Sequence, residues 1–124
     1  MITGTDFVTV PTDDIETSVA FYGDTLGLHR SVHVPERGFA EFETGNLTLS
    51  VLVPTMMGME QYVSNNTIAL QVPDMEAERA RLEAAGVTFH GETLDTGVCH
   101  MAFFRDPHGN PLMLHHRYAP REAE

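Results

Sequence analysis

Three residues of this chain have side chains and positions that could support chemistry: His100, His115 and Glu41. His100 lies in the middle of a predicted strand, and His115 lies two residues after Met113 in another, so those two side chains should share one face. Imidazole exchanges protons near neutral pH, and imidazole and carboxylate are common metal ligands. The three residues could therefore form an acid/base group or a metal site. His100 could instead be a buried, hydrogen-bonded strand residue and His115 a residue at a rim; we favour this interpretation because no compact motif such as HxxxH joins them.

The remaining reactive or adaptable side chains give weaker signals. Cys99 is the only cysteine, and a small core residue is a better interpretation than a nucleophile because nothing near it favours the thiolate. Met56, Met57 and Met59 could line an apolar pocket, cover the core or form a dimer interface. The other histidines are expected on the surface or in loops: His29, His33, His90 and His108.

The elements that must position these residues occur twice in the chain. Residues 7–16 reappear as residues 67–76, with Val8 matching Ile68 and Asp14 matching Asp74. A second repeat relates the turn at residues 43–46 to the turn at residues 107–110. Such a repeat indicates two copies of one supersecondary unit, neither of which can bury its apolar face alone. The seam between the copies is the expected place for a site.

The first copy, module one, is predicted to span residues 5–53 with the order βαβββ. Val8 and Val10 alternate with more polar neighbours, which predicts a half-buried strand over residues 5–11. Asp13 and Glu16 have the spacing of a capping box, and apolar residues at helical spacing predict a helix over residues 14–24. Turn residues then separate three strands, at 29–34, 38–44 and 47–53.

Module two repeats this order over residues 66–117, after a linker at residues 54–65. A strand is predicted at 66–72, followed by a helix from Asp74 to about Ala85 with Gly86 just beyond its end. Three further strands are predicted at 87–92, 97–105 and 111–117. The 124 residues suit a single domain, which we expect to be of the α+β class.

Composition excludes some partners. Eighteen carboxylates against seven Lys and Arg give a net charge of −11, which argues against nucleic acid. The same charge could attract a cationic ligand, although solubility alone would explain it. One cysteine excludes an internal disulfide and favours a reducing, cytoplasmic location. We see neither a secretory signal nor an apolar run long enough to span a membrane.

The repeat, the Phe21-Tyr22 pair, Leu26-Gly27-Leu28 and the turn Asp106-Pro107-x-Gly109-Asn110 together resemble the vicinal oxygen chelate superfamily over residues 5–117. This group is also called the glyoxalase/bleomycin resistance/extradiol dioxygenase superfamily. The resemblance implies two tandem βαβββ modules that form a curled, mixed eight-stranded sheet around a cup, often in a homodimer. It also implies that enzymes of the group hold a divalent metal in the cup, which the substrate chelates through neighbouring oxygens.

Metal-binding relatives draw their ligands from the first and last strand of each module. The resemblance places these positions at Phe7, Thr67, Met113 and one residue of module one's last strand, which is Leu49 by counting from the turn, or Thr48 or Ser50 by alternation. Phenyl, hydroxyl and thioether groups do not replace imidazole and carboxylate around Zn, Mg, Mn or Ni. We therefore predict that the family's metal site and its Lewis-acid mechanism are absent.

These observations predict a metal-free binding protein for a hydrophobic or cationic small molecule. Its cup would be lined by Phe7, Thr67, Met113, His115 and His100. One alternative is a glyoxalase-like lyase, isomerase or dioxygenase with Zn, Ni, Fe or Mn relocated to His100, His115 and Glu41. Another is a dimeric scaffold with a vestigial cup.

Overall fold

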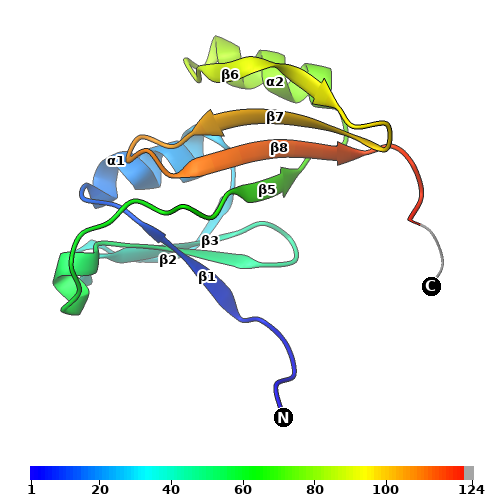
Figure 1. The fold of residues 1–124 in the computed structure, drawn as a ribbon. Helices are drawn as coiled ribbons and strands as arrows, with labels where there is room; N and C mark the ends of the chain where they lie inside the picture. The colour runs from blue at the N-terminus through cyan, green and yellow to red at the C-terminus, as the bar shows by residue number, and fades with distance from the viewer. Residues whose placement is uncertain (122–124) are drawn as a thin grey trace. The chain divides into compact units, whose positions relative to one another are not determined.

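The computed structural model describes residues 1–121, and within them eight strands form two four-stranded sheets (Figure 1). Contacts divide the chain into two units. Unit 1 comprises residues 1–65 and the turn 106–110, and unit 2 comprises residues 66–105 and the chain from residue 111 on. Each sheet belongs to one βαβββ module, which confirms the predicted α+β fold. No described helix combines the length and the apolar character that a membrane crossing needs.

Unit 1 follows the predicted element order. Its main elements are β1 (Phe7–Pro11), α1 (Ile15–Ala20), β2 (His29–Val34), β3 (Phe39–Glu43) and β4 (Thr48–Leu52). A π-helical turn, η1 (Phe21–Thr25), continues α1, and a short 3₁₀ helix, η2 (Pro35–Arg37), joins β2 to β3. A second 3₁₀ helix, η3 (Pro54–Met57), lies in the segment predicted as a linker, which belongs to unit 1 by its contacts.

The start of α1 differs from the prediction by one residue. Asp14, not Asp13, is the N-cap, and its carboxylate accepts a hydrogen bond from the Thr17 backbone N–H at 3.2 Å. The backbone of Asp14 is extended, with φ −138°, as an N-cap requires. The capping box predicted from Asp13 and Glu16 is therefore wrong.

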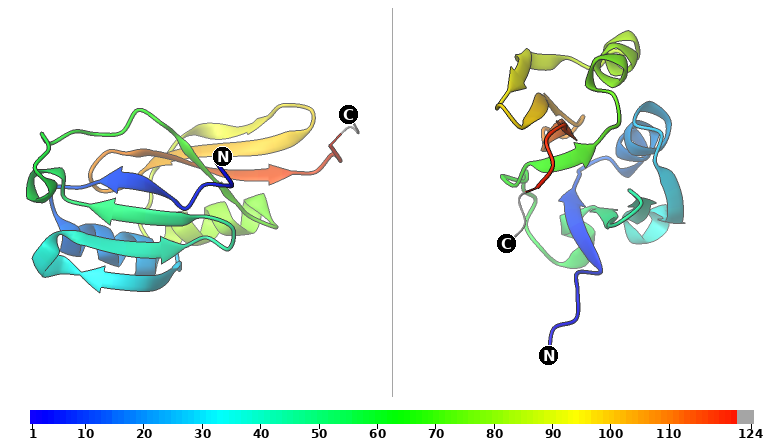
Figure 2. Two further views of the ribbon diagram at one scale, coloured as in Figure 1. Left: turned by 90° about the horizontal axis from the view of Figure 1, so that it is seen from below. Right: turned by 90° about the vertical axis from the view of Figure 1, so that its right-hand side faces the viewer.

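The sheet of unit 1 has the order β1-β4-β3-β2, with β1 parallel to β4 and the other pairs antiparallel. Its register places Val8 beside Leu49 and Val10 beside Val51. Val10, Leu49 and Val51 are buried together with Phe42, whose ring lies 5.9 Å from that of Tyr22 in η1. These side chains form the core between the sheet and its helix, which the left view of Figure 2 shows behind the strands.

The turn Asp106–Asn110 connects β7 to β8 in sequence, yet its contacts belong to unit 1. The Tyr22 hydroxyl donates to the buried Asp106 carboxylate at 2.7 Å, and the Asn110 side-chain amide donates to the same carboxylate and to the Pro11 carbonyl, both at 2.7 Å. The backbone N–H groups of Asn110 and His108 complete the set of donors to Asp106. The family-like turn is therefore a buried polar network in which the carboxylate is fully hydrogen-bonded.

Unit 2 contains β5 (Ile68–Gln71), α2 (Met75–Ala84), β6 (Phe89–Asp95), β7 (Cys99–Arg105) and β8 (Pro111–Arg117). Asp74 caps α2 by accepting from the Ala77 N–H at 3.1 Å, which repeats the role of Asp14 in unit 1. Gly86 follows the helix with φ 97°, the left-handed conformation predicted for a residue just past a helix end.

The sheet of unit 2 has the order β5-β8-β7-β6, and α2 packs on one of its faces. Leu82 of α2 is fully buried, as are Ala102 and Phe104 of β7 and Leu112 of β8. β6 extends to Asp95, three residues beyond the predicted end, because a bulge between His90 and Leu94 takes up the extra residues.

The two registers show how the modules correspond. Val8 pairs with Leu49 in unit 1, and Ile68, the repeat partner of Val8, pairs with Leu112 in unit 2. Leu49 therefore corresponds to Leu112, and Ser50 corresponds to Met113. Counting from the turn pointed to Leu49 because Leu47 precedes β4 in module one, whereas Pro111 directly begins β8 in module two.

Candidate ligand-binding site

Each sheet has one face packed by its own helix and a second face that carries no helix of its unit, which we call the open face. In unit 2, β7 and β8 pair Met101 with His115 and Phe103 with Met113. These four side chains alternate with the buried Ala102, Leu112 and Leu114, so they project from the open face. Three half-buried apolar side chains and one imidazole make this a surface suited to an apolar ligand.

The open face of unit 1 is more polar. The register places Phe7 beside Thr48 and Glu41 beside Ser50. The Phe7 side chain is 51% exposed, whereas Ser50 is buried. The face therefore offers one exposed aromatic ring next to hydroxyl and carboxylate groups.

Glu43, next to Thr48 on this face, is held in its charged form. The hydroxyls of Ser31 and Thr48 donate to its two carboxylate oxygens, the Thr48 bond being 2.6 Å long. These hydrogen bonds lower the pKa of Glu43 below its ordinary value, with a smaller contribution from nearby His29. The open face of unit 1 therefore keeps a negative charge well below neutral pH.

The structure separates the histidines that sequence reasoning grouped together. His100 pairs with His116 across β7 and β8, whereas His115 pairs with Met101. His100 therefore lies on the helix-bearing face of unit 2 and His115 on the open face. The proposed combination of His100, His115 and Glu41 does not form, because the two imidazoles project from opposite faces of the sheet and no three such side chains converge within residues 1–121. His100 is likewise removed from the predicted lining of the cup.

The positions that hold metal ligands in relatives do not fit a metal here. Phe7 and Ser50 lie on the open face of unit 1, and Met113 lies on the open face of unit 2; Thr67 precedes β5. The neighbours of Met113 on its face are thioether and phenyl groups, with His115 alone able to bind a borderline metal. Among residues 1–121, no three His, Cys, Asp or Glu side chains converge so that they could hold a metal ion.

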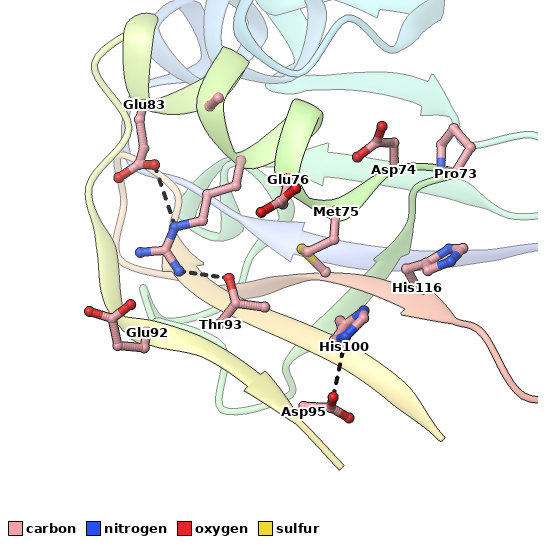
Figure 3. Close-up of a pocket in the computed structure, with 12 residues that line it drawn as sticks. Pro73, Asp74, Met75, Glu76, Glu83, Glu92, Thr93, Asp95, His100 and His116 are labelled. Atoms are coloured by element: carbon pink, nitrogen blue, oxygen red, sulfur yellow. Dashed lines mark hydrogen bonds and ion pairs between the residues drawn. The ribbon is translucent and has the colours of Figure 1, made fainter. Parts of the chain in front are cut away.

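A pocket of about 1090 Å³ lies on the other, helix-bearing side of unit 2 (Figure 3). Its lining comes from α2 and from β6, β7 and β8, and it includes Met75, Arg79, Asp95, His100 and His116. The pocket is thus distinct from the open face of the same sheet. This pocket and Met113 therefore lie on opposite faces of the sheet of unit 2.

His100 has a defined set of partners beside this pocket. Its Nε2 lies 3.5 Å from an Asp95 carboxylate oxygen, and its ring lies 4.9 Å from that of Tyr118. The Asp95 carboxylate also accepts from the Gly97 N–H and the Tyr118 hydroxyl, and these bonds lower its pKa. On the strand beside His100, His116 has its Nδ1 3.0 Å from the Val72 carbonyl oxygen.

Sequence reasoning missed these partners. The Asp95-Thr96-Gly97 segment has the composition of an Asx turn, in which the aspartate accepts from the N–H two residues later, and this was an available signal. Cys99, expected to be a small core residue, is buried, and its Sγ lies 3.0 Å from the Thr96 hydroxyl.

Solved structures with the same fold include an enzyme and a binding protein. Lactoylglutathione lyase from Agrobacterium tumefaciens is 18% identical and matches 94% of this chain and 95% of its own, with a TM-score of 0.80. TnmS3, an antibiotic binding protein from Streptomyces sp. CB03234, is 25% identical over 94% of this chain and 97% of its own, with a TM-score of 0.77. A glyoxalase/bleomycin resistance protein/dioxygenase from Nocardioides is 21% identical over 100% and 91%, with a TM-score of 0.78.

No curated protein sequence matches the chain. The sequence model of one family matches residues 4–114, which is most of the chain and includes both modules. Together with the two βαβββ units, this match shows that the chain belongs to the Glyoxalase/Bleomycin resistance protein/Dioxygenase superfamily.

Proposed function

We propose that this protein binds an apolar or cationic small molecule without a metal, on the open faces of its sheets. The observation that carries the proposal is the chemistry of the ligand positions. Phe7, Ser50, Thr67 and Met113 replace the imidazole and carboxylate groups that a Zn or Mn site needs. Met101, Phe103 and Met113 form an apolar strip on the open face of unit 2, with the imidazole of His115 beside it. Such a strip can still hold an organic ligand through burial of the ligand's surface.

The likeness to TnmS3 supports a binding function, because that relative is an antibiotic binding protein of similar fold and length. The alternative of an enzyme with a relocated metal loses its proposed ligands, because His100 and His115 project from opposite faces.

The proposal predicts that Met113→Ala weakens the binding of an apolar probe. Met113 lies at the centre of the strip, and truncating a buried side chain of its size costs about 1–2 kcal/mol of contact, or roughly five- to thirtyfold in Kd. The probe is 1-anilinonaphthalene-8-sulfonate, with binding followed by fluorescence and by the shift in melting temperature. Ile2→Ala, which truncates an exposed apolar residue of unit 1, is the control and should bind as the unaltered protein does.

Two results would contradict this proposal. One is equal binding by the Met113→Ala variant and the unaltered protein. The other is stoichiometric Zn, Ni, Fe or Mn that survives dialysis and elemental analysis, because the ligand positions would then hold a metal after all. If no apolar or cationic compound shifts the melting temperature, the scaffold alternative gains support instead.

We also propose that the chain acts as a cytoplasmic homodimer. Five large apolar side chains within residues 56–63 are 40–53% exposed, and such a run is unusual on a monomer: Met56, Met57, Met59, Tyr62 and Val63. The buried thiol Cys99, the only cysteine, is consistent with a reducing compartment.

A further inference from the structure

The pocket on the helix-bearing side of unit 2 is a cavity that the proposed ligand site does not use. Its volume, about 1090 Å³, is close to the upper end of the range for small-molecule sites, about 300–1,000 Å³. The helix α2 is shorter than the strands on which it packs. The ten residues of α2 span about 15 Å, whereas the seven residues of β7 or β8 span about 23 Å.

The floor of the pocket contains two imidazole rings with fixed positions. The ring of His100 lies 4.9 Å from that of Tyr118 and 6.4 Å from that of His116, to which it is nearly parallel. The Asp95 carboxylate is a partner of His100, and the Val72 carbonyl is a partner of His116. Met75 adds a thioether and Ala80 a methyl group to the lining. Flat rings and small apolar groups favour a ligand with an aromatic or otherwise apolar body.

The walls of the same pocket are strongly negative. Five carboxylates line it: Asp74, Glu76, Glu83, Glu92 and Asp95. The single guanidinium, Arg79, is already engaged, because it pairs with Glu83 at 3.4 Å and donates to the Thr93 hydroxyl at 3.0 Å. The Arg79 guanidinium also lies over the Phe89 ring, 4.7 Å from its centroid, and so forms part of the wall. The carboxylates that Arg79 does not neutralise leave the pocket with a net negative charge, which favours the binding of a cation.

The spacing of these groups selects an organic cation over a metal ion. A bound metal needs several ligand atoms at one point, and no three such side chains converge within residues 1–121. The carboxylates instead come from separate elements, with Glu76 on α2 and Glu92 on β6 (Figure 3). Negative charge spread around a wide hollow suits a cation whose charge is delocalised and weakly hydrated.

We propose that this pocket is a second binding site, which takes an organic cation with an aromatic body. The site goes beyond the proposed function and does not depend on it, because it lies on the opposite face of the sheet of unit 2 from Met113. One chain could therefore hold two ligands, one on each face of the sheet of unit 2.

The test uses berberine, a flat quaternary cation whose fluorescence rises in apolar surroundings, as the probe. The double variant Glu76→Gln/Glu92→Gln removes two wall charges and keeps the side-chain shapes. We expect its Kd to rise about five- to thirtyfold, because each nearby charge in a partly exposed site contributes up to about 1 kcal/mol. The control is Glu60→Gln/Asp24→Asn, which changes the net charge equally at exposed positions of unit 1 and should shift Kd less than about twofold.

Each other result overturns the second site. If berberine does not bind the unaltered protein, the pocket does not take the proposed class of ligand. Equal losses in both double variants would mean that only the charge of the whole molecule attracts the cation. Binding that Met113→Ala abolishes and Glu76→Gln/Glu92→Gln leaves intact would place the cation on the open face, which would sink this inference and leave the proposed function standing.

Discussion

At the scale of single residues, the most exacting environment is that of the buried Asp106. Four donors surround its carboxylate, and the Tyr22 phenol is the one that comes from outside the turn. Burial, and then the negative charge of Asp106, raise the pKa of Tyr22 far above its ordinary value, so the phenol keeps its proton and donates. The pair therefore works as a hydrogen bond to a charged acceptor rather than as an acid/base couple.

Tyr22→Phe should lower the free energy of unfolding by about 1–3 kcal/mol, because the buried carboxylate loses one of its donors. Urea denaturation measures the change. Tyr118→Phe is the matched control, since its hydroxyl donates to the exposed Asp95 carboxylate at the same distance of 2.7 Å. If Tyr118→Phe lowered the free energy of unfolding as much as Tyr22→Phe does, burial of the carboxylate would not be the reason for the effect.

The residues of the site were predictable only in part. Sequence alternation placed Met113 and His115 on one face, and the structure agrees. It could not place His100, because β7 carries Met101 and Phe103 on one face and Ala102 and Phe104 on the other. With apolar side chains on both faces, a period of two does not reveal which face looks toward the helix.

At the scale of elements, the helix starts are the features with the clearest local cause. The repeat matches Asp14 with Asp74, and both residues are N-caps, although the capping box had been predicted from Asp13. The Thr17 hydroxyl and backbone N–H lower the pKa of Asp14 below its ordinary value of 3.8, because they bind its charged form. The carboxylate thus stabilises the fold fully above pH 3.8, and this contribution is lost as pH falls through the lower, folded-state pKa.

Asp14→Asn retains an amide oxygen that can cap α1 but removes the charge. At pH 7 we expect the variant to unfold at a lower urea concentration than the unaltered protein, and we expect this difference to shrink as pH falls below about 4. Asp24→Asn, at an exposed carboxylate of η1, serves as the control. A difference that stays constant from pH 7 to pH 3 would show that Asp14 acts through shape and not through charge.

The strand ends were harder to predict than the helix starts. β6 runs to Asp95 because Gly91, with φ 75°, lies in a bulge that lets the strand regain its pairing at Leu94. Pairing of this kind depends on the neighbouring strand, and no pattern within residues 87–95 encodes it. The turn of module one likewise differs by one residue from that of module two. Alternation left Thr48 and Ser50 open, and the register decides for Ser50.

At the scale of the whole molecule, the exposed apolar run of residues 56–63 bears on assembly. Met56 also packs over Gly38, where a Cβ would come within 2.8 Å of the Met56 Sδ, so this part of the run is fixed against unit 1. A fixed apolar surface of several large side chains is more consistent with an interface than with a flexible linker.

Light scattering should therefore give a mass close to twice the 13.7 kDa of one chain. The variant Met57→Ser/Met59→Ser should shift the equilibrium toward the monomer, because it removes apolar area from the proposed interface. Leu94→Ser/Val98→Ser changes two comparably exposed apolar residues of unit 2 and should leave the mass unaltered. A monomer at all concentrations of the unaltered protein would refute the homodimer.

The chain passes from one unit to the other at three places, since residues 106–110 return to unit 1 before β8 begins. A gene split at residue 65 would encode one fragment with Tyr22 and Pro11 and another with Asp106 and Asn110, so neither product would own a complete set of hydrogen-bonding partners. The duplicated halves are thus no longer interchangeable copies, because each supplies hydrogen-bonding partners that the other needs. An ancestral half that folded alone would have needed other donors for the carboxylate that Asp106 now provides.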